Sequence, residues 1–137
     1  MALQYSDSVR NAQLDAVEST IGTAAVLKLY DLTAGAPADC AAAITGTVLA
    51  TITLPSDWMN AASSGSKTKL GTWQDSSADA AGTADFFRLF ASDGTTCHAQ
   101  GTVTATGGGG DMTVDNTSFA ATQAFTVTAF TLSDGNA

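Results

Sequence analysis

The chain has 137 residues and a formal net charge of −8, and only 13% of its residues are charged, against roughly 25% in most soluble domains. Its length is typical of one domain that buries about two-thirds of its unfolded surface. Binding to nucleic acid or to anionic lipid is disfavoured, because both need clustered Lys and Arg, and the chain has five such residues. Since it also has neither a secretory signal nor a membrane-spanning apolar run, we expect a soluble protein made in the cytoplasm.

Residues 5–22 are predicted to form an amphipathic helix. Its apolar stripe recurs at three- and four-residue spacing and consists of Leu14, Val17 and Ile21. Ser6 or Asp7 can cap the start of the helix, and Gly22 can end it. Two placements remain open at this point: the helix docks on a neighbouring subunit, or it closes one end of its own β core.

Two strands are predicted after the helix. Residues 25–30 alternate between two faces, one of which carries Ala25, Leu27 and Leu29. Residues 31–45 are predicted to form a long connection, and residues 47–55 a second strand that Pro55 stops. The apolar face of this second strand is expected to hold Val48, Ala50, Ile52 and Leu54.

Residues 56–81 are polar and small, but large apolar side chains interrupt them. A short helical turn is expected at residues 57–62, an exposed mobile tip at 63–67, and a strand at 69–74. Trp58 and Trp73 are the largest apolar groups of the chain. Each fills the core or anchors an interface, and the core is the favoured position.

Residues 82–106 are predicted to form two strands joined by a tight turn at Ser92-Asp-Gly94. The first strand carries apolar side chains on both faces, as is typical of a covered, central strand. Arg88 lies on one of these faces and needs a carboxylate or an aromatic ring beside it if that face is buried.

Two further strands are predicted near the end of the chain. Gly107 to Gly110 reads as a flexible hairpin tip or a place where another chain passes closely. Residues 111–116 are predicted to form a short strand with Met112 and Val114 inward. In residues 124–132 one face is expected to hold Phe125, Val127 and Ala129, and the other Phe130 and Leu132.

Six or seven short strands separated by turns predict a mainly β protein, a single antiparallel β-sandwich or small barrel with an N-terminal α-helix. The expected organisation is an arm and helix in residues 1–22 and a β-sandwich in residues 23–137, together one compact domain.

Catalytic, metal and cofactor sites are not expected. His98 lies within a strand, and its neighbour Cys97 points to the opposite face, so the two cannot form a catalytic dyad. Cys40 and Cys97 are expected to be reduced thiols, with a disulfide as the alternative for a secreted protein. The spacing of these residues does not fit a zinc site, and the acidic residues at 111–116 do not fit an EF-hand loop.

Several segments together resemble small structural proteins of tailed bacteriophages and prophages. The similarity spans nearly the whole chain and is carried by residues 9–18, 21–30, 82–90, 98–103, 110–116 and 130–137. The chain departs from the pattern at Thr122-Gln123, where the resemblance leads us to expect Gly-Gln. The resemblance implies a component of the virion that is synthesised in the host cytoplasm.

From this resemblance we expect a capsid decoration or cement-like protein that binds the major capsid protein or other virion proteins in many copies. We expect it to form a homo-oligomer or a multicopy lattice and to hold no cofactor. The expected partner-binding residues are Leu3, Tyr5, Val9 and Arg10, followed by Trp58 and Trp73. One alternative is a tail, collar or head–tail connector component. Another is a carbohydrate- or host-surface-binding module in which the two tryptophans form a stacking platform.

Overall fold

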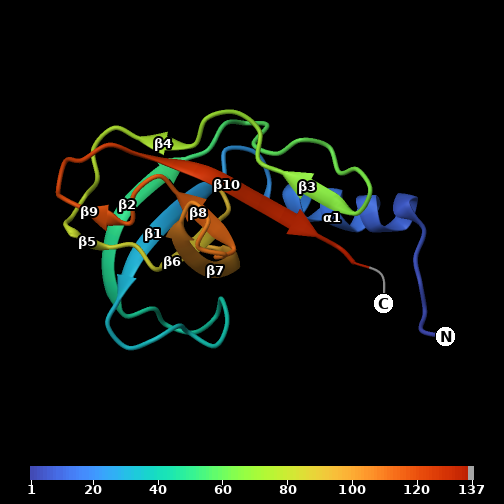
Figure 1. Ribbon diagram of the computed structural model, residues 1–137, viewed down its shortest axis with the longest axis horizontal. Helices are drawn as coiled ribbons and strands as arrows, with labels where there is room; N and C mark the ends of the chain where they lie inside the picture. Colours follow the sequence, from blue (N-terminus) through green and yellow to red (C-terminus); the bar gives the residue numbers. More distant parts are fainter. Residues whose placement is uncertain (136–137) are drawn as a thin grey trace.

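A computed structural model describes residues 1–135 and confirms the mainly β fold with one N-terminal helix (Figure 1). The last two residues of the predicted domain lie outside the described residues. The elements, in chain order, are α1 (Asp7–Ile21), β1 (Val26–Leu32), β2 (Gly46–Thr53), β3 (Ser66–Thr68), β4 (Gln74–Asp75), β5 (Gly82–Thr83), β6 (Phe86–Phe90), β7 (Cys97–Ala105), β8 (Met112–Val114), β9 (Ser118–Phe119) and β10 (Phe125–Ser133).

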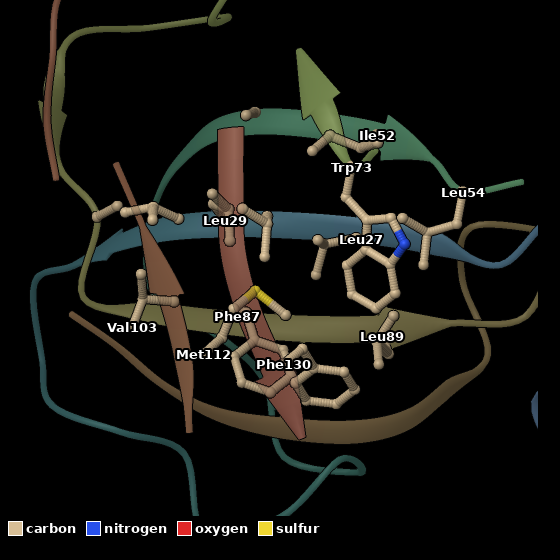
Figure 2. Packing of buried hydrophobic residues seen from close by; sticks show 14 of the residues in the cluster. Leu27, Leu29, Ile52, Leu54, Trp73, Phe87, Leu89, Val103, Met112 and Phe130 are labelled. Atoms are coloured by element: carbon tan, nitrogen blue, oxygen red, sulfur yellow. The ribbon is translucent and has the colours of Figure 1, made fainter. Parts of the chain in front are cut away.

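The main sheet has eight strands, in the order β2-β1-β6-β7-β8-β10-β3, with β4 also paired to β10. The sheet does not close into a barrel, and the fold is sandwich-like. In Figure 2, β10 crosses in front of β1 and β6, and the core side chains lie between these layers. Leu27, Leu29 and Phe87 belong to this core, as their alternation predicts.

The strand β6 is buried on both faces, as its sequence predicts. One face contributes Phe87 and Leu89 to the core, and the other is covered by the connection at residues 33–45. On the covered face, Arg88 donates to the backbone carbonyls of Asp39 and Ala42, at 3.0 and 2.8 Å, and to Oε1 of Gln100 at 3.1 Å. The prediction that Arg88 pairs with a carboxylate or an aromatic ring is therefore wrong. The carbonyl oxygens of the folded connection accept the hydrogen bonds of its guanidinium instead.

The same connection is tied to β7 by a disulfide between Cys40 and Cys97, so the expectation of reduced thiols is wrong. The two cysteines are 57 positions apart in sequence, but the connection folds back over the sheet and brings their Cα atoms to 5.4 Å. This Cα separation is within the range that a disulfide spans. The prediction of reduced thiols rested on the cellular compartment, which says nothing about which cysteines lie close together in the fold.

The helix α1 begins and ends where its caps predict. The Ser6 side chain accepts a hydrogen bond from the backbone N–H of Val9, and Gly22 ends the helix with a φ of +90°. Leu14 and Ile21 are buried, and Val17 packs against the core. The helix therefore closes one end of its own domain, which was one of the two expected placements.

Two β-bulges move side chains away from the faces that strict alternation predicts. In β2, the register shift beside Leu29 buries Leu49 completely and leaves Val48 38% exposed. In β10, a shift between Val127 and Ala129 leaves Ala129 exposed and turns Phe130 into the core. A bulge inserts one unpaired residue and so reverses the alternation beyond it.

Residues 56–81 differ most from the prediction. The expected helical turn at 57–62 is absent from the described structure, and the expected strand at 69–74 reduces to β4 at its end. The tip at residues 63–67 is exposed only in part, because Ser63 and Ser64 are exposed whereas Gly65 and Lys67 are buried. It is a tight turn in which Ser63 and Ser66 exchange backbone hydrogen bonds, and its Lys67 is only 3% exposed.

The glycine-rich segment at 107–110 is not a hairpin tip, because β7 and β8 pair in parallel. This pairing also corrects the expectation of a wholly antiparallel sheet. A parallel connection normally needs a dozen or more residues, whereas this return spans residues 106–111. Gly107 and Gly109 adopt φ values of +86° and +81°, and a Cβ at Gly110 would lie 2.9 Å from the side chain of Thr104. Only glycine allows so tight a return.

The turn before β10 contains Thr122, where the phage resemblance leads us to expect glycine. Thr122 has a φ of +68°, in the left-handed region that favours glycine. Backbone hydrogen bonds from Thr122 N to Ala78 O and from Ala78 N to Gln123 O, both 2.8 Å, hold the turn against Ala78.

Candidate functional site

The N-terminal arm, residues 1–6, precedes α1 and has no regular secondary structure. In Figure 1 it projects beyond the end of the helix, away from the sheet. Leu3 is 74% exposed and Tyr5 is 45% exposed, and Val9 in the first turns of the helix is 42% exposed. These three predicted contact residues are therefore accessible to a partner.

Arg10, the fourth predicted contact residue, is engaged within the chain. Its Nη1 donates to the backbone carbonyl of Asp134 at 2.8 Å, and its Nη2 pairs with the Asp7 carboxylate. The side chain is 14% exposed. Arg10 therefore fastens the first turn of α1 to the end of β10, and its expected role in a partner contact is corrected.

A charged cluster fastens the second half of α1 to the hairpin at residues 60–69. Lys67 Nζ lies 2.7 Å from Asp15 Oδ1, 2.8 Å from Glu18 Oε2 and 2.9 Å from the Asn60 carbonyl oxygen. Burial by itself lowers the pKa of Lys67, but the hydrogen bonds to Asp15 and Glu18 outweigh it and raise the pKa above its usual value. The lysine is therefore held charged.

Both carboxylates of this cluster have further partners. The hydrogen bond from Lys67, followed by that from the Ala62 backbone N–H, lowers the pKa of Asp15 below its usual value. Glu18 Oε1 accepts from the backbone N–H groups of Trp58 and Met59, at 3.3 and 3.1 Å. The cluster accounts structurally for the only glutamate of the chain.

An open groove of about 610 Å³ lies over this cluster, between α1 and residues 56–61. Its walls carry three acidic side chains, those of Asp15, Glu18 and Asp57, and its one cation is Lys67. Lys67 pairs with two of these carboxylates but carries one positive charge, so the charged groups of the lining keep a formal net charge of −2. Within residues 1–135, no three His, Cys, Asp or Glu side chains are grouped closely enough to hold a metal ion.

Trp58 and Trp73 are completely buried, so the prediction that they form partner contacts or a carbohydrate-stacking platform is wrong. Their favoured position in the core is confirmed. The two rings lie 5.9 Å apart, and Trp73 lies 5.6 Å from the Phe130 ring. Trp58 Nε1 donates to the Gly22 carbonyl at 3.0 Å, and Trp73 Nε1 donates to the Leu70 carbonyl at 3.0 Å.

His98 lies exposed on β7, beside a second groove of about 320 Å³ between that strand and α1. The other residues that line this groove are Gln13, Ala16, Val17, Thr20 and Ile21. None of them carries a charge. Sequence reasoning missed this groove, since the proximity of His98 to the helix depends on how α1 packs on the sheet.

The acidic residues at 111–116 serve the backbone. Asp111 accepts from the backbone N–H and the hydroxyl of Thr102, at 2.9 and 2.8 Å, which lowers the pKa of Asp111. Asp93 accepts from Thr96 and Thr95 in the turn before β7, which lowers the pKa of Asp93 from 3.8 to about 2. Asp93 is a local cap of backbone N–H groups, whereas Asp111 joins the segment before β8 to Thr102 on β7.

These pKa shifts predict the pH dependence of stability. The lowered pKa values of Asp15, Asp93 and Asp111 stabilise the fold above about pH 4, and this stabilisation is lost as pH falls through their folded values, toward 2 for Asp93. The raised pKa of Lys67 stabilises the fold below 10.5, and this contribution is lost as pH rises through its folded value. Urea unfolding between about pH 2 and pH 11 is expected to show a plateau with two falling limbs.

Two variants test which side chains cause the loss of stability at acidic and at alkaline pH. Asp93→Asn is expected to flatten the acidic limb. Lys67→Met is expected to reduce the alkaline limb, to which Tyr30 also contributes because burial raises its pKa. An acidic limb of unchanged slope in the Asp93→Asn variant would contradict the assignment to Asp93.

The helix α1, at 15 residues, is too short to cross a membrane, and no other helix occurs in residues 1–135. Comparison of the chain with protein-family models, with curated proteins and with solved structures finds no match in any of the three.

Proposed function

We propose that this protein is a structural component of a phage virion, a capsid decoration protein that binds the assembled head through its N-terminal arm. The observation that carries the proposal is the exposed arm itself. It projects from the domain, and its residues 2–6 carry no charged side chain. Exposed apolar side chains on a projecting segment are typical of a protein–protein contact.

The rest of the surface supports attachment in many copies. It carries few charges and many hydroxyl groups, among them that of Thr128, which hydrogen-bonds to the hydroxyls of Thr106 at 2.8 Å and Thr113 at 2.7 Å. A repeated lattice provides many equivalent sites, and contacts between neighbouring copies then add to a modest affinity for each site. The resemblance to virion proteins favours the major capsid protein as the partner.

The test uses particles of the phage that encodes this chain, stripped of it or made without it. Purified protein is expected to pellet with heads, and the double variant Leu3→Asp/Tyr5→Asp is expected to bind at least about tenfold more weakly, since it places charge in an apolar contact. The matched control is Val48→Asp, which changes an exposed apolar side chain on β2 to the same residue. Thermal unfolding checks that each variant folds.

Three outcomes separate the candidates. Loss of head binding in the arm variant alone supports the proposal. Binding to DNA-free tails and not to heads replaces it with a tail, collar or connector component. Equal loss of binding in the Val48 variant rejects the arm as the contact.

A further inference from the structure

We infer that the outer face of α1 is a self-association surface, and that its occupant is the same face of a second copy of this chain. The outer face comprises seven exposed helix residues on the side opposite the core: Ser8, Val9, Ala12, Gln13, Ala16, Ser19 and Thr20. At 100° per residue they cover one continuous side of the helix. None of them is charged.

All four charged residues of α1 lie on the other side of the helix. Asp7 pairs with Arg10, which also donates to the Asp134 carbonyl just after β10, and Asp15 and Glu18 pair with Lys67. An exposed helix face in a soluble protein normally carries the charged residues. Here it lacks them, in a chain whose formal net charge is −8.

This charge distribution favours a second copy as the occupant. A basic partner would be recognised by carboxylates, and the outer face presents none. Two copies of a chain with a charge of −8 repel each other, so they associate most readily through a surface on which neither desolvates a charge. The outer face meets that requirement on both sides of the contact.

The shape of the face is also self-complementary. Val9 is an exposed apolar side chain at one end, and the groove lined by Ala16, Val17 and His98 lies beside the other end. When two helices pack antiparallel about Ala12 and Gln13, Val9 of each copy lies opposite the groove of the other. A two-fold axis therefore uses the same apolar side chain and the same groove twice.

Sedimentation velocity of the full chain tests this inference, which is independent of the proposed docking of the arm. The protein is expected to form dimers, and the association is expected to strengthen between about 50 mM and about 500 mM NaCl, because salt screens the repulsion between copies. An interface built on ion pairs would instead weaken. A protein that is monomeric at both salt concentrations overturns the inference.

Paired substitutions distinguish the face from net charge. Ala16→Glu and Ala16→Lys are both expected to weaken the dimer by about tenfold or more, since each places a charge in the contact. Ala121→Glu and Ala121→Lys, in an exposed turn, give the same two net charges and are expected to leave the dimer unchanged. If lysine at position 16 strengthens the association, net charge governs it and the inference is wrong.

Two further measurements keep the test decisive. Thermal unfolding shows whether the Ala16 variants fold. If one of them does not, Thr20→Glu, at another exposed position of the face, is tested in its place. The arm variant Leu3→Asp/Tyr5→Asp is expected to remain dimeric. Its dissociation would assign the contact to the arm and overturn the inference about the helix face.

Discussion

Replacing Cys40 and Cys97 together by serine is expected to lower the free energy of unfolding by about 4 kcal/mol, because the bridge closes a loop of 57 positions in the unfolded chain. Urea unfolding of the oxidised protein and of the double variant measures the difference. A reducing agent is expected to bring the wild type to the stability of the double variant and to leave the variant itself unchanged.

The reduced protein is expected to keep its fold. Hydrogen bonds from Arg88 to the carbonyls of Asp39 and Ala42, and from Gln100 to Pro37 at 3.0 Å, still hold the connection on the sheet. In the reduced protein, amide hydrogen exchange is expected to become faster first in residues 33–45 and only afterwards in β6. Equal stability of the oxidised wild type and the double variant would contradict a stabilising role for the bridge.

Local patterns predicted the parts of the fold that depend on neighbouring residues. The helix, its Ser6 and Gly22 caps, and the inward positions of Met112 and Val114 follow from spacing along the chain. Strand alternation failed at the two bulges, where one extra residue exchanged Val48 for Leu49 in the core. A bulge depends on the partner strand, and strand partners were not known from the sequence.

Contacts between distant residues were the main source of error. Lys67 lies in a polar segment and reads as exposed, but its carboxylate partners Asp15 and Glu18 are about fifty positions earlier in the chain. The disulfide and the parallel pairing of β7 with β8 also depend on how distant segments meet. No local signal in the sequence marks these contacts.

The candidate contact residues divide for the same reason. Leu3 and Tyr5 precede the helix and Val9 lies off its apolar stripe, so their exposure was predictable. Arg10 donates a hydrogen bond to the carbonyl of Asp134, more than a hundred positions away in the sequence, so its engagement was not predictable. Bulk and apolarity alone could not decide whether the tryptophans face inward.

The burial of Trp73 predicts a large loss of stability on its removal. Trp73→Ala is expected to lower the free energy of unfolding by about 3–5 kcal/mol, because it leaves a cavity between Trp58 and Phe130. In Figure 2 the indole of Trp73 lies between the layers, close to Leu27 and Leu89. The substitution also removes the hydrogen bond from the indole N–H to the Leu70 carbonyl.

Two controls separate this core role from a surface contact. Trp73→Phe retains most of the buried ring and is expected to cost less than alanine. Leu3→Ala, on the exposed arm, is expected to change the free energy of unfolding by no more than about 0.5 kcal/mol and to weaken partner binding. If Trp73→Ala leaves urea unfolding unchanged and abolishes binding, the indole is a surface anchor and the packing described here is wrong. The two substitutions are thus expected to give opposite signatures, one in the free energy of unfolding and the other in partner binding.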